Sequence, residues 1–289
     1  FNIVKSTFQS DELPNKVMLI TSFQSILMII CSIILIKLYN NDAKSLILGI
    51  SFGYLIPILP YTKLFTSNVI TKKNIKRIKP FFNYGAPLSL WLGISLSLNF
   101  LDRYFIEYYF GSSLMGSYAG FSEFIIRIFS IVIFPITLAV HPILMNKWNK
   151  NKNIHDSLMK LIQASLIQII IFIIMIIPLS IFKDPFFYLI QTMIPELDNS
   201  MNKIMIHIFI GGFLWQIALV LHKPLEIEER TLIMVVCIIL SLLINLIGNI
   251  YFLPKFGILA TGYIMIVSAS TYIISSILFS KSFRKLKKR

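Results

Sequence analysis

Long runs of apolar residues, separated by short polar segments, occupy most of the chain. Each run is about 20 residues long, which is the length an α-helix needs to cross the hydrocarbon core of a bilayer, whereas strands of a membrane barrel alternate over about 10 residues. The pattern predicts an all-α, polytopic transmembrane helix bundle with about eight spans, at 17–36, 45–65, 81–101, 118–140, 158–182, 203–222, 231–252 and 257–279.

The composition excludes most other classes of protein. Hydrophobic residues make up 56% of the 289 residues and charged residues 14%, against about 45–50% and about 25% in a soluble domain. A soluble domain with this composition would have too few polar side chains to cover its core. The net charge of +14 would suggest nucleic acid as the partner of a soluble protein. Here most charges lie between apolar runs, so no nucleic-acid partner is expected.

The positions of Lys and Arg predict how the spans are oriented. With the N-terminus inside, the inside segments hold 18 Lys and Arg and the outside segments hold 5. Cytoplasmic loops are enriched in these residues, so both termini are expected in the cytoplasm. The same basic segments attract anionic head groups, which makes the phospholipid bilayer a partner. The basic loop ending at Pro80 is the expected boundary between a first part, 1–80, and a second part, 81–289, with its basic tail.

From the sequence, neither a catalytic site, a metal site nor a cofactor is expected. It has no phosphate-binding loop and no HExxH motif. The four histidines lie on separate segments without metal-ligand spacing. His222 lies near the inside end of a span, where a polar residue needs no special explanation. Cys31 and Cys237 lie inside apolar runs and form no disulfide framework.

Small and polar residues within the spans form two regular stripes. In the third span Gly85, Ser89, Gly93 and Ser97 recur every four positions, which places them on one helical face, and Pro87 interrupts the same helix. This face is either a seam where helices pack closely or the wall of a substrate cavity. In the seventh span Ser241, Asn245 and Asn249 have the same spacing, and their amides require protein or water beside them.

The fourth span contains two charged residues, Glu123 and Arg127, in an otherwise apolar run. Arg127 lies about 13 Å along the helix from Tyr118, near the middle of a hydrocarbon core of about 30 Å. An ionised group there is costly unless it is paired or hydrated. Glu123 precedes Arg127 by four residues, the favourable order for an intrahelical ion pair. Either this pair is structural or Arg127 meets an anionic substrate or a coupling ion in an aqueous pathway.

Several short motifs, taken in order, resemble one transporter family. The segment from Phe81 reads Phe-Phe-Asn-Tyr-Gly-Ala-Pro-Leu-Ser-Leu and continues to an Asp-Arg pair, two glycines and a tyrosine; a later segment reads Leu-Pro-Lys-Phe-Gly-Ile. This order resembles the seventh, eighth and twelfth helices of polysaccharide and O-antigen flippases, in the multidrug, oligosaccharidyl-lipid and polysaccharide exporter superfamily. The residues that match the family motifs are Gly85, Pro87, Asp102, Arg103, Tyr118, Pro254 and Gly257.

The resemblance implies a fold of twelve helices in two lobes around a central cavity. It implies a protein of the bacterial cytoplasmic (inner) membrane that flips undecaprenyl-diphosphate-linked oligosaccharides to the outer leaflet, alongside other membrane proteins of polysaccharide assembly. Residues 17–65 then match the fifth and sixth helices, and residues 81–289 match the second lobe. The first four helices are expected to lie outside this sequence, and the chain alone is not expected to transport. The candidate cavity residues are Arg127, Glu123, Asn245, Asn249, Ser89 and Gly93.

Two other functions remain open. A drug or cation antiporter of the same superfamily would share the fold, although the basic Arg127 argues against a cationic substrate. A membrane polysaccharide polymerase or ligase would need a long outer loop with reactive side chains. The longest outer segment here, 183–202, contains no His or Arg.

Overall fold

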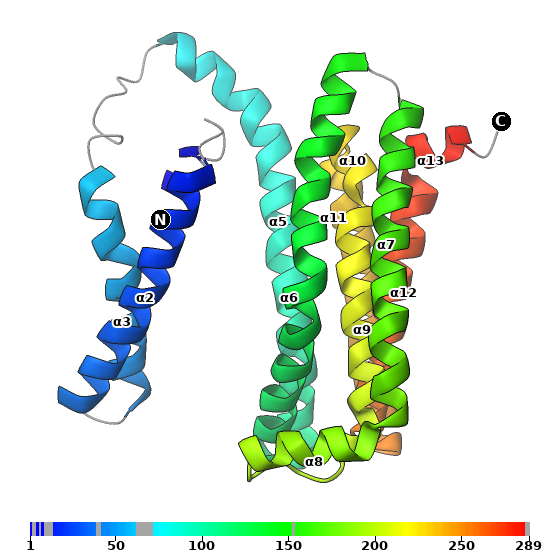
Figure 1. Ribbon diagram of the computed structural model, residues 1–289. Helices are drawn as coiled ribbons and strands as arrows, with labels where there is room; N and C mark the ends of the chain where they lie inside the picture. Colours follow the sequence, from blue (N-terminus) through cyan, green and yellow to red (C-terminus); the bar gives the residue numbers. More distant parts are fainter. Residues whose placement is uncertain are drawn as a thin grey trace. The chain divides into compact units, whose positions relative to one another are not determined.

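The chain is an all-α helix bundle. The computed structural model describes residues 1, 4–5, 7–8, 14–38, 42–61, 72–151 and 154–286, and these contain helices and no β-strand (Figure 1). Contacts divide the chain into two compact units, Phe1–Ile78 and Lys79–Arg289. The division falls close to the expected boundary at Pro80. That the units belong to two lobes of one transporter stays a prediction.

The first unit is built on a helical hairpin. Helix α2 (Pro14–Leu38) packs against α3 (Ala43–Leu55), which continues as a 3₁₀ helix, η1 (Ile56–Tyr61). Asp42 is the N-cap residue of α3, and its carboxylate accepts a hydrogen bond of 2.9 Å from the backbone N–H of Ser45. The two helices approach closely at Gly49, where a Cβ atom would collide with Cα of Ser32. Small residues permit this approach between membrane helices.

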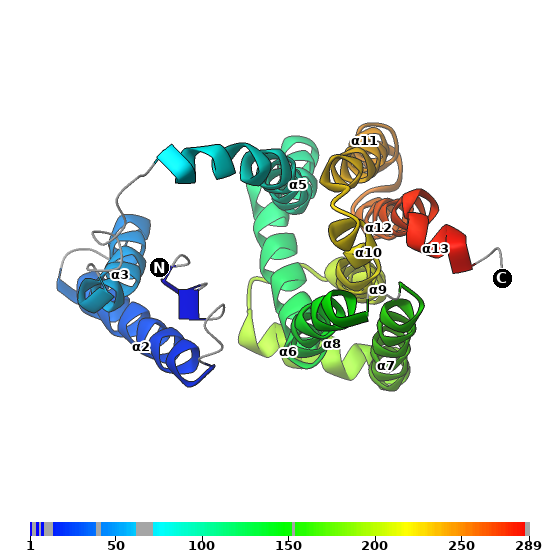
Figure 2. The same ribbon diagram turned by 90° about the horizontal axis from the view of Figure 1, so that it is seen from above.

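The second unit comprises most of α5 and all later helices. Helix α9 lies at its centre, with α6, α7, α10 and α12 around it (Figure 2). Helix α9 is apolar on every side, as expected of a helix surrounded by others. The bounds are α5 (Lys72–Phe110), α6 (Ser112–Asn151), α7 (Ile154–Ile181), α8 (Lys183–Met193), α9 (Met201–Leu221), α10 (Lys223–Ile227), α11 (Thr231–Phe256), α12 (Leu259–Phe279) and α13 (Lys281–Leu286).

Aromatic rings form the centre of this unit. Phe172 of α7 stacks on Phe213 of α9 with ring centroids 4.0 Å apart. Phe129 of α6 meets Phe209 of α9 edge to face at 5.1 Å. Such pairs contribute beyond the area they bury, about 0.5–1.5 kcal/mol each. They fix α6 and α7 against the central helix.

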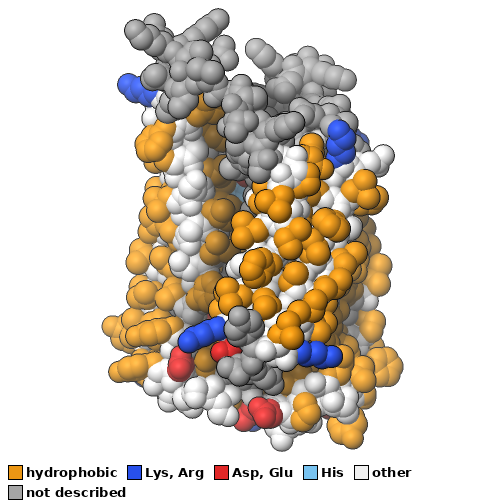
Figure 3. Space-filling view, turned by 90° about the vertical axis from the view of Figure 1, so that its left-hand side faces the viewer, with side chains coloured by type: hydrophobic (Ala, Val, Ile, Leu, Met, Phe, Trp, Pro, Cys, Tyr) orange, Lys and Arg blue, Asp and Glu red, His pale blue; other side chains and the backbone are white. Residues whose placement is uncertain are grey.

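Seven helical segments of the described residues are long and apolar enough to cross a membrane. They correspond to seven of the eight expected spans. The eighth, 81–101 in α5, is long enough, but its glycines, serines and prolines make it less apolar. On the face drawn in Figure 3, hydrophobic side chains cover the middle, and charged side chains lie toward the two ends. A multi-pass membrane protein has this distribution.

Two helices extend beyond the apolar runs that predicted them. The segment 102–117, expected to be a link, is helical except at Gly111, because its polar residues are compatible with a helix outside the hydrocarbon core.

The link 183–202 contains an unpredicted helix, α8, which lies across one end of the second unit (Figure 1). It buries Phe187 and Ile190 and exposes its other face. Its 11 residues are too few to span a bilayer.

Candidate functional site

A buried carboxylate, Asp102 of α5, joins three helices. Its Oδ1 accepts hydrogen bonds from Nδ2 of Asn249 at 2.8 Å and from Nδ2 of Asn245 at 3.1 Å, both on α11. Its Oδ2 accepts a longer bond of 3.5 Å from the hydroxyl of Tyr118 on α6. The structure therefore brings together motif residues and asparagines that the sequence connected only by helical spacing.

This cluster fixes helices to one another. Asn245 and Asn249 are 2% and 0% exposed, so in this structure they contact Asp102 and not solvent. The polar face of α11 thus points to protein, as its spacing predicted. A buried polar group without a partner is costly, which explains why the amides and the carboxylate converge. A cavity-lining role for the two asparagines stays a prediction.

An ion-pair chain follows directly after Asp102. Arg103 Nη2 lies 2.6 Å from Glu123 Oε1, and Arg127 Nε lies 3.2 Å from Glu123 Oε2. The predicted pair of Glu123 and Arg127 is present, and Arg103 is an additional partner. The exposed fraction of the side chain rises from 23% at Arg103 to 45% at Glu123 and 78% at Arg127. One carboxylate pairs with two guanidiniums, so these three side chains together carry one positive charge.

The stripe of small residues on α5 is open within the described part of the chain. Ser89, Gly93 and Ser97 are exposed, and Gly85 is half-buried. A Cβ atom at Gly85 or Gly93 would meet no described atom within 4 Å. No described helix therefore packs against these two glycines, and both roles, packing seam and cavity wall, stay predictions.

The other motif residues shape the chain. Pro87 lies within α5, and Pro254 lies in the last turn of α11. Gly257 ends that helix with φ 65° and ψ −163°, a conformation that is available essentially only to glycine. Pro254 and Gly257 therefore lie where α11 turns back into α12.

A second buried polar cluster was not predicted. His222 is 1% exposed, and both of its ring nitrogens have polar partners, Tyr272 and Glu226. Trp91 of α5 binds the same tyrosine. The interpretation of His222 as an unremarkable helix-end residue is therefore wrong. No local pattern could have revealed the cluster, because Trp91 and Tyr272 are 181 residues apart.

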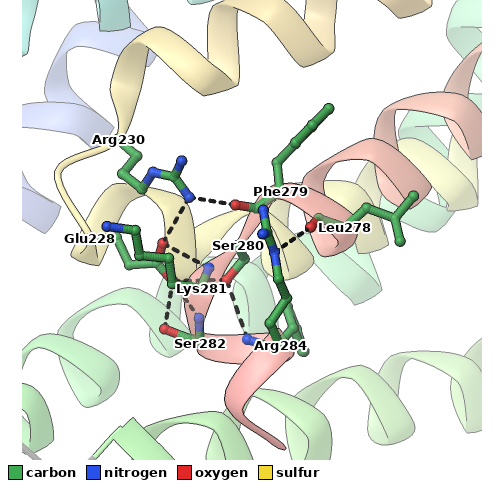
Figure 4. A network of polar contacts seen from close by, with 9 residues as sticks. Glu228, Arg230, Leu278, Phe279, Ser280, Lys281, Ser282 and Arg284 are labelled. Carbon is green, nitrogen blue, oxygen red and sulfur yellow. Dashed lines mark hydrogen bonds and ion pairs between the residues drawn. The ribbon is translucent and has the colours of Figure 1, made fainter. Parts of the chain in front are cut away.

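Glu228 organises a third polar network, at the junction of α12 and α13 (Figure 4). Its carboxylate accepts hydrogen bonds from Ser280, Lys281 and Ser282 at the start of α13. Arg230 and Arg284 donate to carbonyl oxygens at the end of α12. Burial alone would raise the pKa of Glu228, but the bonds from Ser282, Lys281 and Ser280 outweigh it and hold the pKa below its ordinary value.

Comparison with known proteins adds no assignment. In the part of the chain that the structure describes, no three His, Cys, Asp or Glu side chains converge as a metal site. Searches against protein-family models, curated proteins and solved structures found no match. The site is therefore defined by the geometry of this chain: the Asp102 cluster, and beside it the partly exposed Arg103–Glu123–Arg127 chain.

Proposed function

We propose that the chain belongs to a membrane transporter that flips undecaprenyl-diphosphate-linked oligosaccharide repeat units from the cytoplasmic to the outer leaflet of a bacterial inner membrane, for O-antigen or capsule synthesis. The resemblance of its helix motifs to flippases supports the substrate class. The exposed positive charge on α6 supports an anionic ligand.

The position of Arg127 carries the proposal. At 1.5 Å per residue along α6, Arg127 lies about 13 Å from Tyr118 and about 20 Å from Val140, the two ends of the apolar run 118–140. That is too far for the side chain to reach a head-group region easily. A charged residue at the centre of a bilayer costs at least about 3 kcal/mol if it faces lipid. A side chain that is 78% exposed here needs water or an anion beside it.

The ion pair with Glu123 does not remove this requirement. The stronger bond of Glu123, at 2.6 Å, goes to Arg103, and the contact with Arg127 is longer at 3.2 Å. The guanidinium of Arg127 keeps most of its donors available among the described residues. A planar guanidinium binds the oxygens of a diphosphate in a bidentate manner. This chemistry favours a lipid diphosphate over the cationic substrates of an antiporter.

Flipping in liposomes tests the proposal. The reading frame that contains this chain, expressed in full, is reconstituted with a fluorescent polyprenyl-diphosphate oligosaccharide, and its movement between leaflets is followed with a membrane-impermeant quencher. We expect flipping by the parent protein and loss of flipping in the double variant Glu123→Gln with Arg127→Gln. Arg127→Lys should retain part of the rate, since a point charge remains without the planar fork.

A second cation provides the matched control. Lys160 of α7 is exposed and bonds Gln163, so Lys160→Gln removes one positive charge away from α6. It should flip at the parental rate. A double variant that flips as fast as the parent would contradict the proposed role of Arg127. Sugar polymerisation by the purified protein without flipping would favour an enzyme.

A further inference from the structure

The unpredicted cluster forms a continuous hydrogen-bonded chain through the second unit. Nε1 of Trp91 donates to the hydroxyl of Tyr272 at 2.7 Å. That hydroxyl lies 3.2 Å from Nδ1 of His222, and Nε2 of His222 lies 3.1 Å from Oε1 of Glu226. Trp91, Tyr272 and His222 are 8%, 0% and 1% exposed. The chain connects α5, α12 and the junction of α9 with α10.

The groups at the two ends determine the protons of the neutral chain. The indole of Trp91 can only donate, so the oxygen of Tyr272 accepts from it. The carboxylate of Glu226 can only accept, so Nε2 of neutral His222 carries the ring proton and donates it to Glu226. Nδ1 then accepts from the hydroxyl of Tyr272, and an incoming proton binds at this nitrogen.

The surrounding charges are arranged to bind that proton. Glu226 lies beside the imidazole, and its carboxylate also binds Nζ of Lys223 at 2.7 and 2.9 Å. A carboxylate favours the charged imidazolium, and a lysine opposes it. Histidine is the side chain whose ordinary pKa lies within the physiological range. The titratable groups around the cluster include Lys223 and Glu226 on α10, Glu229 just after it, Tyr272 on α12, Cys237 on α11 and Tyr84 on α5.

We propose that His222 is a proton-binding site whose occupancy controls the attachment of α5 to α12. A proton that binds Nδ1 turns this nitrogen from an acceptor into a donor. The oxygen of Tyr272 then accepts from both Trp91 and His222, and its own proton loses its acceptor. Ser276, one turn further along α12, has a buried hydroxyl beside that of Tyr272, and it is the new acceptor.

Helix α5 is the element that responds. Between Lys79 and Phe110, four described residues of α5 are buried. Two of them, Trp91 and Asp102, make polar contacts with other helices. Reorientation of the Tyr272 hydroxyl changes one of these two attachments. The proton-binding step is independent of the proposed function. The further conclusion, that protons are the coupling ion of transport, rests on it.

Trp91 itself reports the proton. The chain has three tryptophans, and Trp148→Phe with Trp215→Phe leaves Trp91 alone. Its ring centroid lies 5.0 Å from that of His222, close enough for an imidazolium, but much less for a neutral imidazole, to quench its emission. The protein in detergent is titrated from about pH 9 to about pH 5, on either side of the ordinary histidine pKa of about 6.5. We expect emission to fall in one sigmoidal step on acidification.

Three variants decide the assignment. His222→Gln should abolish the step. Glu226→Gln removes the favourable charge and should weaken proton affinity by about tenfold or more, moving the midpoint to lower pH. Lys223→Met removes the opposing charge and should move the midpoint to higher pH. The opposite directions of these two shifts keep the test decisive even if His222→Gln fails to fold.

The proposal is overturned if the folded parent shows no step, if His222→Gln retains it, or if the two neighbouring variants do not shift the midpoint in opposite directions. The readout is proton binding, not flipping. A protein that binds the proton but moves no lipid-linked sugar would refute the proposed transport function and leave this site intact.

Discussion

Substituting Glu228 by Gln tests how firmly one carboxylate holds α13 against the end of α12. Oε1 accepts three hydrogen bonds, from the hydroxyl of Ser280 at 2.8 Å and from the backbone N–H and hydroxyl of Ser282 at 2.8 and 2.6 Å. Oε2 accepts one from the backbone N–H of Lys281 at 3.1 Å. Arg230 Nη1 lies 3.8 Å from the same oxygen.

The cost follows from what an amide can replace. Gln keeps one carbonyl oxygen, which preserves the three bonds of Oε1 as neutral ones. Its NH₂ group then faces the N–H of Lys281 and the guanidinium of Arg230, so that bond is lost. Bonds to a charged acceptor contribute about 1.5–3 kcal/mol and neutral ones about 1 kcal/mol. The Glu228 side chain is only 9% exposed, so water can replace few of the hydrogen bonds that are lost. We expect Glu228→Gln to destabilise the junction by about 2–4 kcal/mol, allowing for non-additivity.

The effect should depend on pH in a defined direction. The pKa of Glu228 is held below its ordinary value in the folded protein. The unfolded state therefore binds the proton more readily, and the stabilisation is fully present above the ordinary Glu pKa of about 4.3. It is lost as the pH falls through the lower, folded-state pKa. The parent and Glu228→Gln should differ at neutral pH and converge in acid.

Hydrogen exchange at the start of α13 measures this stability directly. A loss of 2–4 kcal/mol accelerates exchange through local opening by about 30- to 1,000-fold. Glu229→Gln is the matched control, because Glu229 is exposed and carries the same charge next to Glu228. It should leave exchange at Lys281 and Ser282 unchanged. Equal exchange in Glu228→Gln and the control at neutral pH would refute the reasoning.

Substitutions at three further positions have defined outcomes. Glu229 has φ 54° at the end of α10, so Glu229→Gly should stabilise by about 0.5–1 kcal/mol in a denaturant titration. Gly49→Ala forces a Cβ atom against Ser32 and should lower the melting temperature, by an amount equivalent to about 1–3 kcal/mol. Asp102→Asn keeps an acceptor for the two asparagines of α11, whereas Asp102→Ala leaves buried amides unpaired, so the alanine variant should unfold at clearly lower detergent stress.

Periodicity predicted which faces are polar, but not what they meet. The four-residue spacing of Asn245 and Asn249 places both on one side of α11, and that side is buried. Their partner, Asp102, precedes them by 143 and 147 residues. The spacing of Glu123 and Arg127 predicted their ion pair because both lie on one helix. Arg103 joins them from the other side of a turn, which no local pattern encodes.

Apolar runs predicted where the long helices lie better than they predicted where those helices end. A run ends where the chain leaves the hydrocarbon core, but the hydrogen-bond pattern of a helix continues until a residue interrupts it. Helix α5 therefore continues past residue 101 to Phe110, and α6 begins again just after Gly111. The short helix α8 was missed because it lies across the bundle end and needs only a few apolar residues on one side.

Charge balance distinguishes the α6 face from the other polar clusters. Arg103 is flanked by Asp102 in sequence and bound by Glu123, so two carboxylates offset its charge. Arg127 shares the carboxylate of Glu123 with Arg103 and makes the longer of the two contacts. It is the most exposed of these four side chains. The formal charges of the four side chains sum to zero, and the positive charge that is offset least is that of Arg127, on the exposed face of α6. Since such a charge is stable in a membrane only beside water or an anion, the ligand of this protein should be sought at this face.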